Sequence, residues 1–318
     1  MKTPSRLKSA KRTYKRLMKG KLFRKSEFGT GISDLTLRGI IGKRKNRLPG
    51  NRQRPVKLEL LPSASQGACS SRKVCIYIGS EPDQYRAERV LLWSILKHRN
   101  VNRHYEIFIM KDLQGFDRKK WKTGFTAYRY AIPQFAGFQG LAIYNDVDQI
   151  YLRDPADLLE VDMHGAAILA VESRDTSVML LDCEPLSGVW SAAAVHEAPQ
   201  HSIHTFMLRR ARAKHLISDL PGQWNARDHE YNDNSSSLLH YTILHTQPWR
   251  PFPQDLRYRE NLQGLPWFTL EEEADAKCFA PLWKSSPGRP YTDMQDFFEV
   301  STDEAPDEFP DNSGRITA

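Results

Sequence analysis

Asp146 and Asp148 stand two residues apart directly behind the apolar run 141–144, and their type and spacing suit metal chemistry. Carboxylates at the end of a buried strand are costly in free energy unless a positive charge meets them. Hard divalent cations such as Mg²⁺ and Mn²⁺ prefer oxygen ligands and share them with phosphates. In open α/β sheets, ligands bind beyond the carboxyl ends of the strands. The pair therefore predicts a metal–diphosphate site at a strand end, although a D-x-D of two solvated acids also arises by chance.

The elements that would position these aspartates alternate between strand and helix patterns. A continuous apolar run over 74–78 predicts a strand buried on both faces. A turn over 79–83 follows it, then a helix over 86–98 and a second strand over 105–110. This order favours a parallel sheet with a nucleotide-sized ligand at its first turn. The turn lacks both G-x-G-x-x-G and a P-loop, so neither a dinucleotide-binding fold nor an NTPase is indicated.

Further elements are expected along the rest of the chain. A helix over 126–135 would be interrupted or restarted by Pro133. The other expected elements are the D-x-D strand, a short helix over 154–159, strands over 166–171 and 177–182, a helix with a basic face over 203–217, a loop over 220–225 and a short strand over 238–242.

The charge of the chain is unevenly distributed. The 318 residues carry a formal net charge of +8, yet residues 1–57 hold 19 Lys and Arg against two acidic residues, a net +17, so the remainder carries −9. Residues 27–72 are rich in Gly, Ser, Arg and Pro and are predicted to be a linker. We therefore predict three parts: a basic extension and linker over 1–72, a folded domain over 73–295, and an acidic disordered tail over 296–318.

The first 26 residues place apolar side chains near helical spacing among Lys and Arg. This pattern predicts a basic amphipathic helix on an anionic membrane surface. Binding to nucleic acid and a solvated, disordered tail stay open, because a charge pattern does not separate these three outcomes.

Several classes are disfavoured by what the sequence lacks. No run of 18 apolar residues predicts a membrane span, and the N-terminus has no apolar core of a secretory signal. The four cysteines form no C-x-x-C pair and have no zinc spacing, which is typical of reduced thiols in a cytosol. We therefore expect a cytoplasmic protein, with a peripheral position on the cytoplasmic membrane face if the basic extension binds there.

Five short motifs occur in an order that resembles glycosyltransferase family 8, the retaining nucleotide-sugar transferases that include glycogenin and bacterial lipopolysaccharide galactosyltransferases. The resemblance covers about residues 73–252. The motifs are Tyr128-Arg129-Tyr130 one helix before the D-x-D, the D-x-D after Ala-Ile-Tyr, the strand Ser177–Asp182, Trp224-Asn225, and His240-Tyr241-Thr242 with Pro248-Trp249 behind it.

This resemblance implies a fold and a reaction. The fold would be GT-A, a Rossmann-like α/β fold with a mixed, mostly parallel sheet flanked by helices. The reaction would move a hexose, with retention, from a UDP-sugar to a glycan, polysaccharide or glycolipid acceptor, with Mn²⁺ or Mg²⁺ as the cofactor. A divalent cation on the diphosphate neutralises the charge that develops on the leaving group.

The resemblance also implies site residues. Asp146, Asp148 and His240 match the metal ligands, and His245 is the rival of His240. The residues that match the catalytic and donor-sugar positions are Arg129, which would contact the donor, Asp175, which falls beside the donor sugar, and Gln247, which stands where relatives carry a phosphate-binding Lys. The residues that match the nucleotide-binding positions are Ile78, Gly79, Ser80, Tyr85, Asp146 and Val147.

The segment behind His240 departs from the family pattern. A Gly of the family motif is absent, the spacing to Pro248 is one residue longer, and Gln247 replaces a Lys, which keeps a hydrogen-bond donor but brings no charge. This leaves an alternative open: a catalytically inactive nucleotide-sugar-binding module with a membrane- or nucleic-acid-binding basic tail. Trp224-Asn225 would line the acceptor side or simply pack, and Asp182 is expected to cap a strand end rather than act in catalysis.

Overall fold

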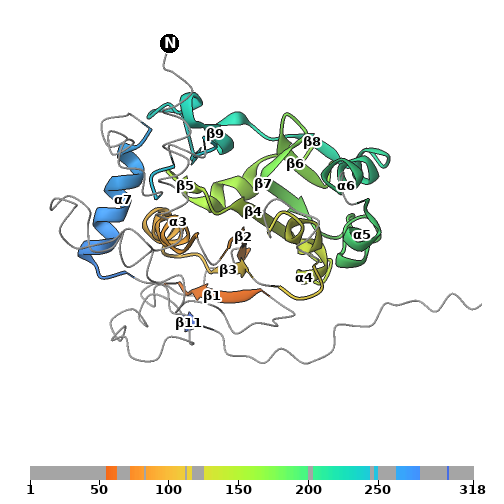
Figure 1. The fold of residues 1–318 in the computed structure, drawn as a ribbon, viewed down its shortest axis with the longest axis horizontal. Helices are drawn as coiled ribbons and strands as arrows, with labels where there is room; N and C mark the ends of the chain where they lie inside the picture. Colours follow the sequence, from red (N-terminus) through yellow and green to blue (C-terminus); the bar gives the residue numbers. More distant parts are fainter. Residues whose placement is uncertain are drawn as a thin grey trace, which may run out of the picture.

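A central eight-stranded sheet organises the part of the chain that the structure describes (Figure 1). This structure is a computed structural model, and it describes residues 55–62, 72–81, 84–111, 113–116, 125–199, 203–243, 247–249 and 263–279, together with the backbone of 299–300. The strands, in their order across the sheet, are β11 (Glu299–Val300), β1 (Val56–Leu60), β3 (Tyr105–Met110), β2 (Val74–Gly79), β4 (Leu141–Asp146), β7 (Asp175–Asp182), β6 (Ile168–Val171) and β8 (Ile217–Asp219).

The centre of this sheet is parallel and its flanks are mixed. β2 pairs in parallel with both β3 and β4, and β6 pairs in parallel with β8. β1 lies antiparallel to β3 and β11, and β7 lies antiparallel to β4 and β6. The predicted strands over 74–78 and 105–110 are confirmed as β2 and β3, and their apolar runs are buried on both faces of the sheet.

Helices cover both faces of the sheet (Figure 1). One apolar core joins the sheet to α3 (Tyr85–His98) and α7 (Leu265–Ala276). The other core joins it to the 3₁₀-helix η4 (Tyr128–Ala131), α4 (Ile132–Phe135), α5 (Ala192–Glu197) and α6 (Ile203–Arg212). The predicted fold class, α/β with a Rossmann-like mixed sheet between helices, is confirmed. Within the described part of the chain, no helix combines the length and the hydropathy that a membrane crossing requires.

A second, three-stranded sheet begins directly behind the D-x-D. It consists of β5 (Gln149–Tyr151), β10 (Leu238–His240) and β9 (Ala226–Arg227), with β10 in the middle. β10 runs antiparallel to β5, so that His240 stands opposite Gln149. Three short 3₁₀-helices complete the described fold: η5 (Pro155–Glu160), η6 (Gly222–Asn225) and η7 (Asp228–Glu230). The predicted strand over 238–242 is confirmed as β10, and it brings a distant segment to the D-x-D.

Helix α3 forms where the sequence predicts it, because its apolar residues recur at helical spacing. Ala87, Val90, Leu91 and Ile95 are all buried against the sheet. The predicted helix over 126–135 is divided into η4 and α4, and Pro133 stands in the first turn of α4, where its missing N–H costs nothing.

The predicted domain boundary at residue 73 is wrong, because the segment predicted as linker contains β1. Val56, Leu58 and Leu60 are buried and alternate with half-buried residues, and β1 pairs with β3 along its whole length. The strand was missed because its short period-2 pattern lies in a basic, Pro-rich stretch. Glu299–Val300, inside the predicted disordered tail, forms β11 beside β1. Residues 1–54 lie outside the described residues.

One other predicted element differs from the structure, and one helix of the structure was not predicted. The basic helix predicted over 203–217 ends at Arg212, because His215 takes a left-handed backbone conformation (φ 55°) that ends the helix and turns the chain into β8. Helix α7 has no counterpart among the sequence predictions. Ion pairs of Arg86 with Glu271 and of Lys97 with Glu273 join α7 to α3.

Replacing Leu58 by Ala tests whether β1 belongs to the folded domain. Leu58 is fully buried, so the variant should lose about 2–5 kcal/mol of unfolding free energy in a denaturant titration. Leu61 is the matched control, because it is 43% exposed and its replacement by Ala should change stability by less than about 0.5 kcal/mol. Equal, small effects of the two substitutions would mean that this segment is a linker and that β1 does not belong to the folded domain.

Candidate active site

The D-x-D lies at the carboxyl edge of the two central parallel strands. Asp146 is the last residue of β4 and stands beside Gly79, the last residue of β2. The backbone N–H of Val147 donates to the carbonyl oxygen of Gly79 at 3.1 Å. The two aspartates therefore lie where open α/β sheets bind their ligands.

Asp146 is held by an arginine and a tyrosine. Its Oδ1 accepts a hydrogen bond from Arg129 Nη2 at 2.7 Å and another from the Tyr144 hydroxyl. Arg129 Nη1 donates to the carbonyl and the hydroxyl oxygen of Thr176, each at 2.8 Å. Burial raises the pKa of Asp146 to about 6, although the Arg129 charge acts in the opposite direction. The predicted donor contact of Arg129 stays a prediction, since its guanidinium is buried and these bonds direct it at Asp146.

One carboxylate oxygen of Asp148 accepts a hydrogen bond, and the other accepts none from the described residues. Its Oδ2 accepts from Gln247 Nε2 at 3.4 Å, and its backbone carbonyl accepts from the N–H of Tyr241 at 2.9 Å. Oδ1 is buried and has no hydrogen-bond partner among the described residues. The nearest charged contact of Oδ1 is Nε2 of His240, 3.3 Å away. A buried carboxylate oxygen of this kind is costly unless a cation or a proton meets it.

His240 faces Asp148 with one ring nitrogen and Asn225 with the other. Nδ1 lies 2.8 Å from Asn225 Oδ1. Asn225 Nδ2 donates to Asp175 Oδ2 at 3.0 Å and to Ser177 Oγ at 3.1 Å. Burial alone would lower the pKa of His240, but the Asp148 carboxylate raises it above its ordinary value.

Asp175 lies behind His240, at the first position of β7. Its Oδ1 accepts from the backbone N–H of Ser177 at 3.1 Å and from the Ser177 hydroxyl. Burial would raise the pKa of Asp175, but these hydrogen bonds hold it below its ordinary value. The predicted place beside a donor sugar stays a prediction, whereas the contact with Asn225 is an arrangement that sequence reasoning did not foresee.

Four of the six residues predicted to bind the nucleotide lie at the end of β2 and the start of α3, and the other two, Asp146 and Val147, lie at the end of β4. The side chain of Ile78 is in the apolar core and its backbone lies between β3 and β4. The Ser80 hydroxyl donates to Glu88 Oε2 at 2.6 Å, and Lys111 Nζ donates to the same oxygen at 2.6 Å. Tyr85 is half-buried at the first position of α3. The buried ion pair of Lys111 with Glu88 thus holds Ser80 in place beside the D-x-D.

Two other residues singled out in the sequence have clear positions, and a third lies outside the described residues. Trp224 packs in the apolar core, which favours the packing interpretation over acceptor binding. Asp182 lies at the opposite end of β7 from Asp175, and its Oδ1 accepts from the backbone N–H of Glu184 at 3.4 Å, as expected of a strand-end cap. His245, the rival of His240, lies outside the described residues.

Tyr144 and Asn225 are the contacts that sequence reasoning missed. Tyr144 precedes Asp146 by two residues on the same strand, so the two side chains share one face of the sheet, and this period-2 spacing could have identified it. Asn225 was noted in the Trp-Asn motif, but its contact with His240 depends on the pairing of β9 with β10.

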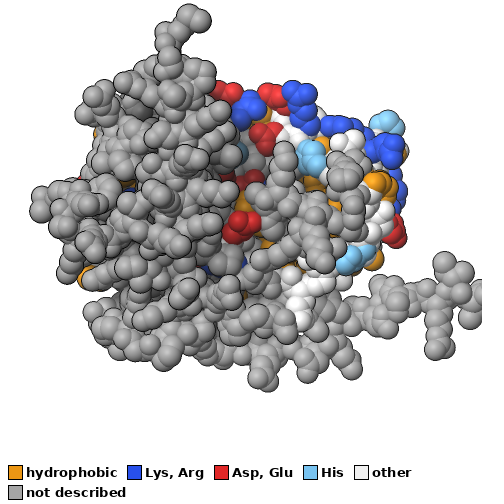
Figure 2. Space-filling view, viewed as in Figure 1, with side chains coloured by type: hydrophobic (Ala, Val, Ile, Leu, Met, Phe, Trp, Pro, Cys, Tyr) orange, Lys and Arg blue, Asp and Glu red, His pale blue; other side chains and the backbone are white. Residues whose placement is uncertain are grey.

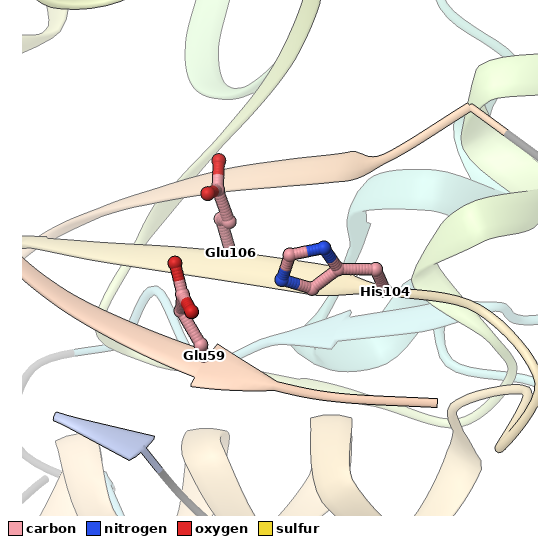
Figure 3. Close-up of side chains that lie close together, drawn as sticks. All are labelled: Glu59, His104 and Glu106. Atoms are coloured by element: carbon pink, nitrogen blue, oxygen red, sulfur yellow. The ribbon is translucent and has the colours of Figure 1, made fainter. Parts of the chain in front are cut away.

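A second group of metal-capable side chains lies at the amino end of β3, away from the D-x-D (Figure 3). Ligand atoms of Glu59, His104 and Glu106 all lie within 4.8 Å of one another. Lys57 contacts both carboxylates, and Lys73 Nζ lies 2.8 Å from Glu106 Oε1. Because each carboxylate already has a lysine partner, we interpret this group as an ion-pair network between strands.

The surface around the site is acidic in its middle and basic at one end. Figure 2 shows acidic side chains near the centre of this face, over the area where Figure 1 draws β4, and Lys and Arg side chains at the upper right, near α6 and β8. The last turn of α6 carries Arg209, Arg210 and Arg212. The central acidic charge favours cations at this edge of the sheet.

Comparisons with known proteins give remote similarities. No protein-family model matches the chain. Protein CDI of Arabidopsis thaliana is 22% identical over 253 residues, which are 70% of this chain and 88% of that protein. The glycosyltransferase GlyE of Streptococcus pneumoniae aligns with a TM-score of 0.46 at 16% identity over 69% of this chain, and the galactosyltransferase LgtC, solved with donor and acceptor sugar analogues, aligns with a TM-score of 0.43 at 10% identity over 71% of it.

The aligned lengths differ among these structures. The chain spans 66% of GlyE, 100% of LgtC and 47% of the bifunctional glycosyltransferase WbbM, which aligns with a TM-score of 0.43 at 12% identity. These values do not assign the chain to a family, so membership of family 8 stays a prediction, and the function is argued below from the geometry of the site.

Replacing Gly79 by Ala tests the packing that holds Asp146. An added Cβ would lie 2.5 Å from the Tyr144 hydroxyl and 2.9 Å from a ring carbon of Phe125. We expect a loss of about 1–3 kcal/mol in unfolding free energy. Gly222 is the control, because a Cβ there meets nothing within 4 Å, and its replacement by Ala should change stability by less than about 0.5 kcal/mol.

The same substitution should cost less when Tyr144 is already Phe, because the atom nearest to the new Cβ is then gone. A double-mutant cycle in denaturant titrations measures this coupling. Purely additive costs would mean that the hydroxyl of Tyr144 does not occupy this position.

Proposed function

We propose that this protein is a metal-dependent, retaining glycosyltransferase of the GT-A type that moves a hexose from a UDP-sugar to a glycan, polysaccharide or glycolipid acceptor. The observation that carries the proposal is the approach of Asp148 Oδ1 to His240 Nε2 at 3.3 Å, beside Asp146 at the carboxyl edge of the sheet; this oxygen is buried and accepts no hydrogen bond from the described residues. The order of motifs in the sequence supports the reaction class.

The residues at this edge supply the types of donor atom that a divalent cation takes, although the ligand atoms of Asp146, Asp148 and His240 are not grouped within 4.8 Å of one another as those of Glu59, His104 and Glu106 are. Asp146 and Asp148 offer carboxylate oxygens and His240 offers an imidazole nitrogen, a donor set that suits Mn²⁺ and also Mg²⁺. The 3.3 Å between Asp148 Oδ1 and His240 Nε2 is near the spacing of about 3 Å between neighbouring ligands of one octahedral cation. When bound, the cation would neutralise the negative charge that develops on the leaving diphosphate.

The surrounding side chains would hold these ligands in place. Arg129 and Tyr144 both bind Oδ1 of Asp146, so Oδ2 is the oxygen that we assign to the cation. Gln247 and Tyr241 orient Asp148 through its Oδ2 and its backbone carbonyl. Arg129 is therefore a positioning residue in this proposal, and its positive charge also offsets the two carboxylates.

The turn behind β2 would receive the nucleotide. Gly79 lies beside Asp146, and Ser80 is fixed through Glu88 by the buried charge of Lys111. A ligand at the carboxyl ends of β2 and β4 would thus contact this turn and the cation together.

A catalytically inactive nucleotide-sugar-binding module is the alternative function. It is favoured by Gln247, which donates a hydrogen bond to Asp148 Oδ2 but brings no positive charge for a phosphate. Binding without turnover in the experiment below would select this alternative.

Asp148→Asn is the central test of the proposed function. The wild-type protein should show a rise in melting temperature with one UDP-sugar that depends on Mn²⁺, because a ligand that binds only the folded state stabilises it. Asp148→Asn should abolish this rise and lower UDP-sugar turnover by at least about 10²-fold, since a carboxylate ligand is lost.

Asp182→Asn is the matched control, because this aspartate lies at the opposite end of β7. It should keep the Mn²⁺-dependent shift. The absence of any shift with every nucleotide sugar in the wild-type protein would contradict the proposed function.

The basic extension supports a proposal on location. Residues 1–57 carry a net +17 ahead of a net-acidic remainder, and clustered Lys and Arg are attracted to anionic membrane surfaces. We propose a cytoplasmic protein that is held at the membrane face where a glycolipid or polysaccharide acceptor is assembled.

Deletion of residues 1–54, which leaves β1 intact, should remove the protein from anionic vesicles in a flotation assay. Neutral vesicles are the control and should bind neither form. Unchanged binding of the shortened protein to anionic vesicles would contradict this location, and loss of salt-sensitive RNA or DNA binding would favour nucleic acid instead.

A further inference from the structure

We propose that Asn225 and Asp175 are positioning residues that fix the tautomer of His240, so that the lone pair of its Nε2 faces Asp148 and the cation. This inference rests on the proposed function, because it concerns the same metal site. It gives Asp175 a role behind the metal ligands, which differs from the place beside the donor sugar that the sequence implies.

The direction of each hydrogen bond follows from Asp175. An ionised carboxylate accepts hydrogen bonds and cannot donate them, so the Asn225 amide must turn its NH₂ toward Asp175, 3.0 Å away. Its carbonyl oxygen Oδ1 then faces His240 Nδ1 at 2.8 Å. Because Oδ1 is an acceptor, Nδ1 must carry the proton. In the neutral ring, Nε2 is then the unprotonated nitrogen.

The arrangement around Nε2 agrees with this assignment. Asp148 Oδ1 is 3.3 Å from Nε2 and has no hydrogen bond among the described residues. Two acceptor atoms that face each other at this distance need a cation or a proton between them. A His that ligates a metal typically donates its other ring N–H to a fixed acceptor, which sets the tautomer and the orientation of the ring.

Elements of secondary structure position each residue of this chain of contacts. Asn225 is completely buried at the end of η6. His240 is the last residue of β10, and Asp175 is the first residue of β7. β9, which follows Asn225 directly, pairs in parallel with β10. Ser177 braces the chain, because its hydroxyl contacts both Asp175 and Asn225. The carboxylate thus acts through a neutral amide, which orients the imidazole without placing a third negative charge on it.

The tautomer can be measured in the metal-free protein. Long-range ¹H–¹⁵N spectra of the full chain with ¹⁵N-labelled histidine, recorded where the ring of His240 is neutral, should show a proton on Nδ1 and none on Nε2. His240→Gln identifies the signal. A neutral ring protonated on Nε2 would overturn the inference directly.

Metal affinity gives a second, independent readout, with Mn²⁺ alone as the probe. Asn225→Leu keeps the size of the side chain but removes the acceptor for Nδ1–H, and it should weaken Mn²⁺ binding by about 10–100-fold in an EPR titration of free Mn²⁺. The matched control is Asn145→Leu, which removes an equally buried amide on β4 whose partners are Gln149 and Tyr151. Its Mn²⁺ affinity should stay within about 3-fold of wild type, because the hydrogen bonds of Asn145 go to Gln149 and Tyr151 and not to a proposed metal ligand.

A charge swap distinguishes positioning from simple packing. Asn225→Asp alone would set two carboxylates against each other at the position of the 3.0 Å bond and should weaken Mn²⁺ binding. Adding Asp175→Asn restores a donor opposite the new carboxylate, which still accepts from Nδ1–H, so the double variant should recover the affinity of the wild type. Failure to recover, in a double variant that unfolds at the wild-type temperature, would overturn the inference.

The outcomes separate this inference from the proposed function. If wild type binds Mn²⁺ and Asp148→Asn does not, while Asn225→Leu binds as tightly as wild type, the metal site stands and the role of Asn225 is refuted. If the wild type binds no Mn²⁺, both fail.

Discussion

Two carboxylates lie largely buried at the carboxyl end of β4, and the need to compensate their charge dominates the surrounding structure. Asp146 and Asp148 have side chains that are 14% and 17% exposed. Burial of such groups is strongly unfavourable without partners. Arg129 supplies a permanent positive charge to Asp146, whereas Asp148 meets His240, a group that compensates charge only if it is protonated or if it shares a cation. The pair is therefore only partly neutralised by the described side chains.

The topology explains how these groups meet. The parallel pairing of β2 with β4 sets the end of β2 beside Asp146. β5 follows directly in a second sheet, and β10, from a distant part of the sequence, pairs antiparallel with it, which brings His240 to Asp148. β7, antiparallel to β4, starts at the same edge and contributes Asp175. β4, β10 and β7 thus deliver Asp146, His240 and Asp175 to the same edge, while the apolar cores lie on both faces of the sheet.

The local pattern of apolar residues predicted the central strands β2 and β3 and the helix α3, because the apolar residues of each element recur with the spacing that its own secondary structure requires. It also marked the D-x-D as a candidate site, whereas His240 and Gln247 were named through the resemblance to family 8. It failed at β1, whose five residues Val56–Leu60 show an alternation too short to outweigh a basic, Pro-rich surrounding. The contact of Asn225 with His240 could not be read from the sequence, since it arises from the pairing of β9 with β10 and from the hydrogen bonds that Asp175 imposes. The buried position of Arg129 likewise follows from tertiary packing.

The central claim is that Asp148 and His240 ligate one cation. Pulsed EPR of the full-length protein with bound Mn²⁺ tests it most directly, because it detects nitrogen nuclei that are coordinated to the metal. The account predicts a coupling to an imidazole nitrogen that changes when histidine is labelled with ¹⁵N and disappears in His240→Gln. Tightly bound Mn²⁺ without any histidine nitrogen coupling would contradict it.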